Sequence, residues 1–305
     1  MNKKEPANVA ASVRQRLLNI SKERKEEFQF ILTRYAIERL LHRLSVSKYA
    51  DDFTLKGAVL FQLWTGAPHR STLDLDLLGS GDDAVARFES IFREIFVLRV
   101  EADGLVFLPE SIKGEPIRED QRYGGVRIRG VATLERARIP LQIDIGIGDV
   151  VTPKALTVSY PTLLKMPAPS LKAYPKETVV AEKCEAMIAL GIANSRMKDF
   201  YDLWVICTRF EFDGPLLVAA LSATFKRRGT EFPATTPIAL TSVFTEDHGK
   251  YLQWIAFVRR GALAVEVPEF KAVIELLHSF LAPALDAARG NQHFIKKWSP
   301  GGPWY

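Results

Sequence analysis

The nonapeptide STLDLDLLG, residues 71–79, alternates strictly between apolar and polar positions from Leu73 onward. Successive side chains of an extended chain point to opposite sides, so Asp74 and Asp76 share one face, and Leu73, Leu75 and Leu77 share the other. The alternation therefore predicts a β-strand with one buried face and one acidic face.

A second segment, PLQIDIGIG at residues 140–148, repeats this pattern and places Asp144 on a polar face. If the two strands are neighbours, Asp144 lies beside Asp74 and Asp76. Two aspartates one residue apart on a strand are separated by about 6 to 7 Å along it. This spacing suits carboxylates that hold a pair of Mg²⁺ ions on substrate phosphates. The alternative is that the two aspartates are the solvated face of an edge strand.

A glycine turn precedes the acidic strand. The segment FTLKG, residues 53–57, predicts a strand that ends at Lys56 and Gly57, and AVLFQLWTG, residues 58–66, predicts a short helix. A helix that starts at such a turn presents backbone N–H groups to phosphate oxygens. Otherwise Gly57 is only a tight connection and Lys56 a surface residue. Arg70 and Ser71, just before the acidic strand, are further candidates for phosphate contacts.

The rest of the chain divides into a mixed part and a helical part. Helical periodicity, β-strand runs and a proline-rich segment predict the following organisation: two helices over 8–45 with a break near Ser21, a helix over 82–98, strands over 104–147, prolines from 153 to 175, and helices from 177 onward. A boundary near 175 separates a first domain, 1–175, from a helical domain, 176–305. The tail from 290 is expected to be an irregular arm.

Bulk composition limits the class of protein. With 305 residues, of which 47% are hydrophobic and 25% charged, the chain can form two cores. It lacks the apolar run of about 18 to 20 residues that a membrane span needs, and its N-terminus does not resemble a signal peptide. We therefore expect a cytoplasmic protein without membrane contact. Cys184 and Cys207 fall in helical segments and are expected to be buried thiols, in neither a disulfide nor a zinc site.

The net charge favours polyanionic partners. The formal charge is +5 and the pI is about 9.1, and contacts between basic side chains and phosphate release counterions. Basic clusters at 226–228, 259–260 and 296–297 are candidates for a nucleic-acid track, but such clusters are more often solvated surface.

The helical part contains a second group of candidate residues. Lys183 falls within an apolar stripe, which predicts that its ammonium group reaches a cleft or a buried anion. Lys198, Asp199 and Asp202 have helical spacing and are expected on one face. The simpler interpretation is an intrahelical salt bridge between Lys198 and Asp202. The histidines form no ligand-spaced pair, and only His69, next to Arg70, invites a test.

Four motifs together resemble one known family. LKGAVLFQLWTG, HRSTLDLDLLG, LQIDIGIGD and VVAEKCEAMIALGIANSRMKDFYDLW occur in the order found in the AbiEii/AbiGii nucleotidyltransferase-like toxins, which include the MenT group. The resemblance covers about residues 53 to 209. It implies an α+β fold, in which a polymerase-β-like nucleotidyltransferase core with a small mixed sheet precedes a mainly helical C-terminal domain.

The resemblance also implies roles for individual residues. The glycine motif maps to Gly57 and Ala58 with Lys56 in front, where Ala58 replaces the serine of the commoner form. The DxD metal motif maps to Asp74 and Asp76. The remaining implied positions are Asp144 as the third metal ligand, Lys183 at the nucleotide phosphates, Asp199 as the first choice within the later acidic motif, and Lys198 and Asp202 beside it.

The implied activity is transfer of a nucleoside monophosphate from an NTP to an acceptor, dependent on two Mg²⁺ ions. The expected acceptor is the 3′ end of tRNA, in a toxin restrained by a cognate antitoxin. Two alternatives remain open: transfer to a protein or small molecule, and a non-catalytic RNA-binding or partner-binding protein on the same fold.

Overall fold

The computed structural model describes residues 8–70, 72–119, 123–261, 263 and 265–305. These form two compact units. The first contains the described residues of Met1–Ala67, Thr72–Gly148 and Thr157–Ala173, and the second those of Pro68–Ser71, Asp149–Leu156 and Tyr174–Tyr305. The helical unit therefore includes two short segments that precede residue 174, one of which leads directly into the acidic strand.

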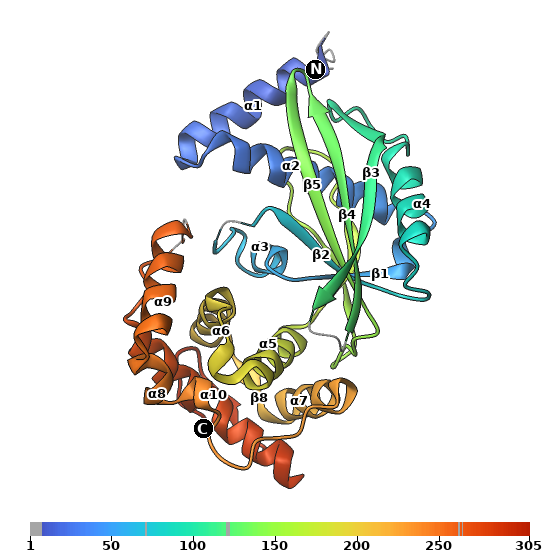
Figure 1. Cartoon of the computed structure of the whole chain (residues 1–305). Helices are drawn as coiled ribbons and strands as arrows, with labels where there is room; N and C mark the ends of the chain where they lie inside the picture. The colour runs from blue at the N-terminus through green and yellow to red at the C-terminus, as the bar shows by residue number, and fades with distance from the viewer. Residues whose placement is uncertain (1–7, 71, 120–122, 262, 264) are drawn as a thin grey trace. The chain divides into compact units, whose positions relative to one another are not determined.

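The first unit is built on a mixed sheet with the strand order β3-β4-β5-β2-β1-β7-β6 (Figure 1). β2 pairs with β5 in parallel and with β1 in antiparallel orientation, and β1 pairs with β7 in parallel. The long strands β3, β4 and β5 form an antiparallel meander. The bounds are β1 Phe53–Lys56, β2 Asp74–Gly79, β3 Leu105–Glu119, β4 Tyr123–Leu134, β5 Ala137–Ile147, β6 Leu156–Ser159 and β7 Ser170–Ala173.

The buried face of this sheet follows from the alternation in β2 and β5. Leu75 is 0% and Leu77 1% exposed, and Ile143 and Ile145 are also fully buried. Helices α2 (Phe28–Ser45) and α4 (Val85–Phe96) pack against the sheet (Figure 1). Leu73 differs from expectation: it precedes the strand, which begins at Asp74, and is exposed.

The first two helices are separated later than the sequence predicts. Helix α1 spans Val9–Arg24, and its C-cap Lys25 adopts a left-handed conformation with φ 54°. Ser21, the expected break, lies inside α1, and its hydroxyl donates to the Glu26 carbonyl oxygen at 2.7 Å. The side chain of Ser21 therefore fastens the turn after the helix. Helix α3 is short, Val59–Thr65.

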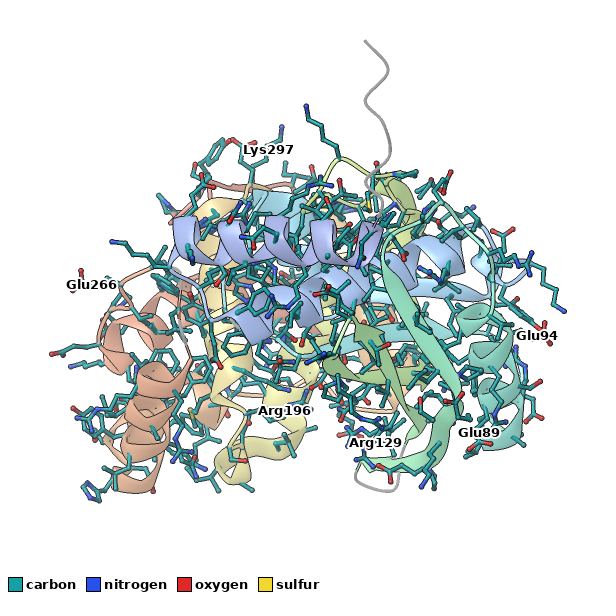
Figure 2. The ribbon with its side chains drawn as sticks, turned by 90° about the horizontal axis from the view of Figure 1, so that it is seen from above. Glu89, Glu94, Arg129, Arg196, Glu266 and Lys297 are labelled. Carbon is teal, nitrogen blue, oxygen red and sulfur yellow. The ribbon has the colours of Figure 1, made fainter. Side chains whose placement is uncertain are left out.

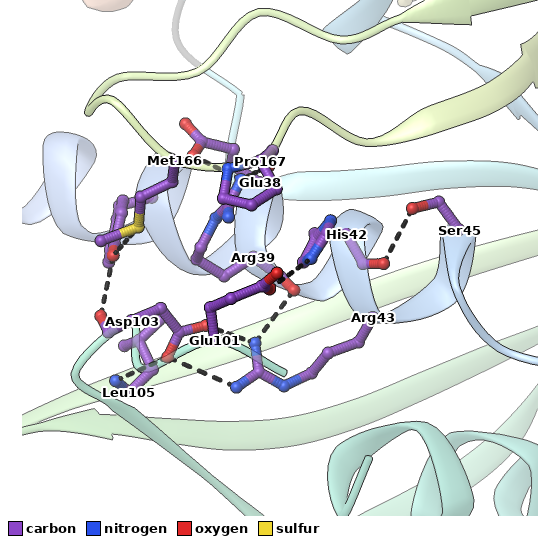
Figure 3. Close-up of polar contacts among 11 residues, drawn as sticks. Glu38, Arg39, His42, Arg43, Ser45, Glu101, Asp103, Leu105, Met166 and Pro167 are labelled. Carbon is purple, nitrogen blue, oxygen red and sulfur yellow. Dashed lines mark hydrogen bonds and ion pairs between the residues drawn. The ribbon is translucent and has the colours of Figure 1, made fainter. Parts of the chain in front are cut away.

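A buried polar network fixes α2 to two loops of the same unit (Figure 3). The Arg43 guanidinium pairs with the Asp103 carboxylate at 2.5 Å, and the Tyr35 hydroxyl donates to the Asp103 carbonyl oxygen at 2.7 Å. Arg39 donates to the Pro167 carbonyl oxygen at 2.8 Å. Buried charges are tolerated when they are paired in this way, so the network holds α2 in one position.

Glu38 belongs to this network and is 1% exposed. Burial raises its pKa to about 7, although the Leu163 amide and the Arg39 guanidinium both favour the charged carboxylate. In the unfolded chain the ordinary value is 4.5. The folded protein thus retains a proton on Glu38 that the unfolded chain has released. The contribution of this group to stability is complete below the unfolded pKa and is lost as the pH rises through the folded pKa.

Glu38→Gln is accordingly expected to become more stable relative to the parent protein as the pH rises from 4.5 to about 8. The relative gain is up to about 3 kcal/mol, since each pKa unit corresponds to about 1.4 kcal/mol. Urea unfolding of both proteins at pH 5 and pH 8 measures the change. Glu94→Gln, at an exposed ion pair with Lys48, should show no such trend. A difference between parent and Glu38→Gln that is equal at both pH values would contradict the prediction.

The second unit is helical apart from a small two-stranded antiparallel sheet. Its elements are α5 Lys176–Leu190, α6 Met197–Arg209, α7 Gly214–Arg228, α8 Ser242–Glu246, α9 His248–Arg260, α10 Phe270–Gly290, β8 Phe212–Asp213 and β9 Lys297–Trp298. The tail is not an irregular arm, because β9 pairs with β8 and Trp298 is 1% exposed. The Trp298 indole N–H donates to the Cys207 carbonyl oxygen at 2.7 Å. In the described part of the chain, no helix combines the length and apolar character of a membrane span.

Candidate active site

Three acidic positions lie on one face of the sheet in the first unit. β2 places Asp74 and Asp76 opposite the buried leucines, with a burial pattern that alternates along the strand. β5 runs parallel beside it, with Asp76 in register with Asp144 and Asp74 in register with Gln142. Paired positions of neighbouring strands point to the same side. The strand pairing therefore brings Asp74, Asp76 and Asp144 together on the polar face.

Gly57 lies directly against Asp76. Its φ is 76°, in the left-handed region, and a Cβ atom built on it would fall within 2.6 Å of the Asp76 Cγ. The carboxylate of Asp76 thus occupies the space that any side chain at position 57 would need. Glycine is required here both for the backbone turn and for the close approach of Asp76.

Gly57→Ala is expected to displace Asp76 and to lower any activity that depends on it by about 100-fold or more, since shifts of about 1 Å in a reacting group have effects of this size. Gly66→Ala is the matched control, because Gly66 has the same φ of 76° and open space around its Cβ position. Both changes should cost about 1 to 2 kcal/mol in backbone strain. Thermal melting and an activity assay on both variants separate the two effects; equal activity losses would contradict the assignment.

The turn also positions Lys56 and Ala58. Lys56 is the register partner of Asp76 across β1 and β2, and Ala58 is the N-cap of α3. The first amides of α3 are partly used, because Leu60 N–H donates to the Gly57 carbonyl oxygen and Phe61 N–H to that of Ala58. Those two N–H groups are therefore not available to a phosphate as the turn stands.

Asp144 is held by a residue that the sequence analysis did not single out, Arg127 on β4. The Arg127 Nε donates to one oxygen of Asp144 at 2.8 Å and a terminal nitrogen donates to the other at 2.7 Å. Gln142 adds a longer contact of 3.3 Å. The hydrogen bonds that Arg127 donates to Asp144 are the main reason that the pKa of Arg127 lies above its ordinary value, and the charge of Asp74 adds to the effect.

The strand register aligns five charged residues across the polar face, one on each of five neighbouring strands. The order is Glu115 on β3, Arg127 on β4, Asp144 on β5, Asp76 on β2 and Lys56 on β1. We call this set the charged row, and its strands can be followed in Figure 1. Charges alternate along the row except between Asp144 and Asp76, where two carboxylates are neighbours. Adjacent like charges favour a bound cation or a proton.

The chemistry of the acidic face fits a hard divalent cation, for which carboxylate oxygens are the preferred protein ligands. Asp74, Asp76 and Asp144 are the residues that would hold it. As the side chains stand, however, no three His, Cys, Asp or Glu residues in the described part of the chain form a group that could bind a metal ion. Both Asp144 oxygens contact Arg127, so the guanidinium lies at the oxygens that a cation would use.

A second cluster lies in the helical unit, around Asp202 of α6, which is 0% exposed. Arg70 donates to both of its oxygens, at 2.8 Å and 2.9 Å, and the His69 Nε2 lies 2.6 Å from one of them. The Lys183 ammonium is 2.9 Å from the other oxygen. Burial alone would raise the pKa of Asp202, but Arg70 and Lys183 hold it well below its ordinary value.

Lys183 of α5 joins Asp202 to Asp199. Its ammonium lies 2.6 Å from an Asp199 oxygen, and Arg196 approaches the other oxygen at 2.7 Å. Burial disfavours the charge on Lys183, but the two aspartates outweigh it and raise the pKa. The pKa of Asp199 is lowered, because Lys183 and Arg196 overcome the effect of burial. These ionised groups form one buried ion-pair cluster.

The remaining candidates have different surroundings. Lys198 is exposed, whereas Asp199 and Asp202, three residues apart on α6, are both buried. Asp202 pairs with Arg70 and Lys183 of other segments, so its contacts differ from the intrahelical salt bridge with Lys198 that was the simpler interpretation. Ser71 lies outside the described residues. Arg228 of the basic cluster at 226–228 is bound by Glu185 at 2.8 Å and Asp149 at 3.1 Å. Its charge is thus satisfied within the unit, and only the exposed Lys226 and Arg227 of that cluster face solvent.

Three residues of these clusters were not predicted as site residues from the sequence: Arg127, His69 and Arg196. Arg127 and Arg129 alternate in GVRIRGVATL, which predicts a common face but not which strand they oppose. His69 was set aside because it has no ligand-spaced partner, whereas its ring stacks on Tyr201 at 5.6 Å between ring centres and faces Asp202. Arg196 has helical spacing to Asp199, which is the one local signal available.

A presumed nucleotidyltransferase from H. pylori is similar, with 13% identity, a TM-score of 0.46, and coverage of 84% of this chain and 95% of that one. JHP933 from Helicobacter pylori gives 12% identity, a TM-score of 0.45, and coverage of 83% and 89%. No curated protein matches in a sequence search. The family model described as nucleotidyl transferase AbiEii toxin, type IV toxin–antitoxin system, matches residues 39–276. This match spans most of the chain, which therefore belongs to the AbiEii family of nucleotidyltransferase toxins of type IV toxin–antitoxin systems.

Proposed function

We propose that this chain transfers a nucleoside monophosphate from an NTP to an acceptor hydroxyl with the help of two Mg²⁺ ions. One observation carries the proposal: Asp76 and Asp144 are register partners on parallel strands, with Asp74 on the same face and Gly57 packed on Asp76. Family membership supports the same class of reaction.

The residues divide the work as follows. Asp74, Asp76 and Asp144 would hold Mg²⁺, which would neutralise negative charge on the phosphates when bound. Asp144, once free of Arg127, accepts the proton of the acceptor hydroxyl. The acceptor oxygen forms a bond to the α-phosphorus, the bond from that phosphorus to the bridging oxygen breaks, and pyrophosphate leaves with the bonding electrons.

Lys183 is proposed to stabilise negative charge on the nucleotide phosphates. Its pKa lies above the ordinary value, so the ammonium is charged at neutral pH, and a fixed charge of this kind stabilises a transition state electrostatically. Asp199 and Asp202, at 2.6 Å and 2.9 Å from the ammonium, orient it. Lys56 and the backbone at Gly57 and Ala58 are the proposed phosphate contacts of the first unit.

The proposed acceptor is RNA, at the 3′ end of tRNA. The support is the formal charge of +5, which favours a polyanion. The biological role proposed is growth arrest, restrained by the cognate antitoxin of the type IV system to which the family belongs.

Two labels on the same nucleotide test the reaction type. The full chain is incubated with Mg²⁺, total RNA and each NTP, labelled either at the α-phosphate or at the γ-phosphate. Transfer of a nucleoside monophosphate predicts RNA that carries the α label and lacks the γ label, with one pyrophosphate released per label incorporated. RNA that carries the γ label and lacks the α label would indicate a kinase, which transfers only the terminal phosphoryl group, and would contradict the proposal.

Parallel reactions with purified tRNA, total protein and aminoglycoside-type small molecules separate the acceptor classes. Label in protein or drug, with none in RNA, would refute the RNA acceptor but not the reaction type. Absence of transfer in every reaction, combined with RNA binding that Asp74→Ala and Asp144→Ala do not affect, would favour a non-catalytic binding protein.

A further inference from the structure

Arg127 and Asp144 form a bidentate ion pair within the charged row. They are register partners on antiparallel strands, and the guanidinium binds both carboxylate oxygens side by side, at 2.8 Å and 2.7 Å. Bidentate pairs of this kind are among the stronger ionic contacts in proteins, because two parallel N–H···O hydrogen bonds join groups of opposite charge. The side chains remain partly accessible, with 29% exposure for Arg127 and 19% for Asp144, so the pair can open without unfolding the sheet.

The pair lies at the point where the row would otherwise be most acidic. Asp144 has Asp76 as its neighbour on one side and Arg127 on the other. Arg127 also interacts with the charge of Asp74. The guanidinium thus supplies positive charge beside the carboxylates that the proposed function assigns to Mg²⁺. Arg127 and the cation compete for the same Asp144 oxygens.

Charged residues of β3 and β4 surround Arg127 on the side away from Asp144. On β3 its register partner is Glu115, whose carboxylate is already paired with Arg129 at 2.8 Å. Arg129 lies two residues along β4, on the same face, and its side chain is 54% exposed (Figure 2). A freed Arg127 therefore adds to an existing basic position on this face. A guanidinium group can bind two oxygens of a phosphate in the same bidentate way in which it binds the two oxygens of a carboxylate.

We propose that Arg127 is an internal competitor of the divalent cation at Asp144, and that cation binding releases its guanidinium to bind a phosphate group of the nucleotide. This inference rests on the proposed function. It explains how three carboxylates on one face are compatible with a structure in which they do not yet form a metal-binding group. It also makes cation binding and phosphate binding mutually supportive, because each favours the separation of Arg127 from Asp144.

Mn²⁺ binding to the full chain, followed by electron paramagnetic resonance, tests the competition without any activity measurement. Arg127→Ala and Arg127→Gln are expected to bind Mn²⁺ at least about tenfold more tightly than the parent, since the cation no longer has to break a charge-assisted pair. Arg129→Ala is the matched control: it removes the same charge from the same face and should change the affinity by about twofold or less.

The gain must also depend on Asp144. In an Asp144→Asn background, Arg127→Ala should give no tightening, which a double-mutant cycle measures as coupling between the two positions. Circular dichroism and thermal melting verify that each variant is folded. Unchanged or weaker Mn²⁺ binding by both Arg127 variants would overturn the proposal and would assign Arg127 the role of orienting Asp144. Absence of Mn²⁺ binding in parent and variants alike would overturn it as well.

The phosphate half of the proposal has its own measurement. In the labelled-NTP assay, Arg127→Ala should raise KM for the NTP by about tenfold, and Arg127→Lys, which keeps the charge but not the planar fork, should lie between Ala and the parent. If the NTP is transferred normally and KM does not change, the inference fails while the proposed function stands. Tighter Mn²⁺ binding by Arg127→Ala without transfer by any variant would support the competition and reject the proposed function.

Discussion

Asp76→Ala is expected to abolish nucleotidyl transfer, with a loss of at least about a thousandfold, and to remove toxicity when the chain is expressed without an antitoxin. Asp76 lies on β2, between β5 and β1, in the charged row. Lys56 and Asp144 are its register partners on either side, and Gly57 leaves space for its carboxylate. In the proposed function Asp76 would help to hold Mg²⁺, and loss of its carboxylate would remove a ligand of the ion.

Two further variants make this prediction specific. Asp76→Asn keeps the size of the side chain and should lose activity almost as fully, because the amide lacks the negative charge. Asp51→Asn removes an equal charge from the same unit, at an exposed ion pair with Lys172, and should retain the activity of the parent. Transfer that persists in folded Asp76→Ala, measured with the α-labelled NTP, would show that the acidic face is not the site of the reaction.

The acidic face was predictable because its signal is local. Strict alternation in residues 71–79 and 140–148 determines which side chains share a face, whatever the strands pair with. The structure then joins the two segments as the parallel pair β2 and β5. The glycine turn was equally predictable, because the local pattern of a short strand, Gly57 and a short helix indicates a tight turn at that glycine. What the alternation does not contain is the neighbour on the other side of β5.

The contact of Arg127 with Asp144 could not be predicted, because it depends on how β4 pairs with β5. β4 and β5 are joined by a two-residue turn between Leu134 and Ala137, in which Glu135 adopts a φ of 51°. Asn-Gly or Asp-Gly would have indicated such a hairpin, but Glu135 and Arg136 do not. Without the turn, the register of the hairpin is unknown, and a shift by one residue would place Arg127 on the opposite face from Asp144.

The helical unit shows a different limit of sequence reading. Helical periodicity located its main helices, but the tail lacks periodicity and was expected to be irregular. Trp298 and Trp304 instead pack on Phe280 of α10, at 4.9 Å and 5.8 Å between ring centres. Aromatic burial of this kind depends on the surface that the earlier helices create. The contact between His69 and Asp202 joins residues 133 positions apart, and no local pattern encodes it.

The second large effect is expected from Asp202→Ala, which should destabilise the helical unit by about 3 to 5 kcal/mol. Asp202 is 0% exposed and accepts contacts from Arg70, Lys183 and His69. Removal of its carboxylate takes away the two oxygens that Arg70 contacts and one of the two carboxylates beside Lys183, which keeps Asp199 at 2.6 Å. Poorly compensated buried charge is one of the few mechanisms that give losses of this size. Asp202→Asn should be intermediate, because the amide oxygen still accepts one hydrogen bond.

Tryptophan fluorescence during urea unfolding can follow this unit selectively. Four of the five tryptophans belong to it, namely Trp204, Trp254, Trp298 and Trp304, and a Trp64→Phe background removes the signal from the first unit. Asp286→Ala is the control, since Asp286 is 69% exposed and pairs with Arg289 on the surface of α10, where a loss within about 0.5 kcal/mol is expected. A loss below about 1 kcal/mol for Asp202→Ala would mean that Arg70 and Lys183 find other partners. The ion-pair cluster would then orient Lys183 for the nucleotide without being a main source of stability in the helical unit.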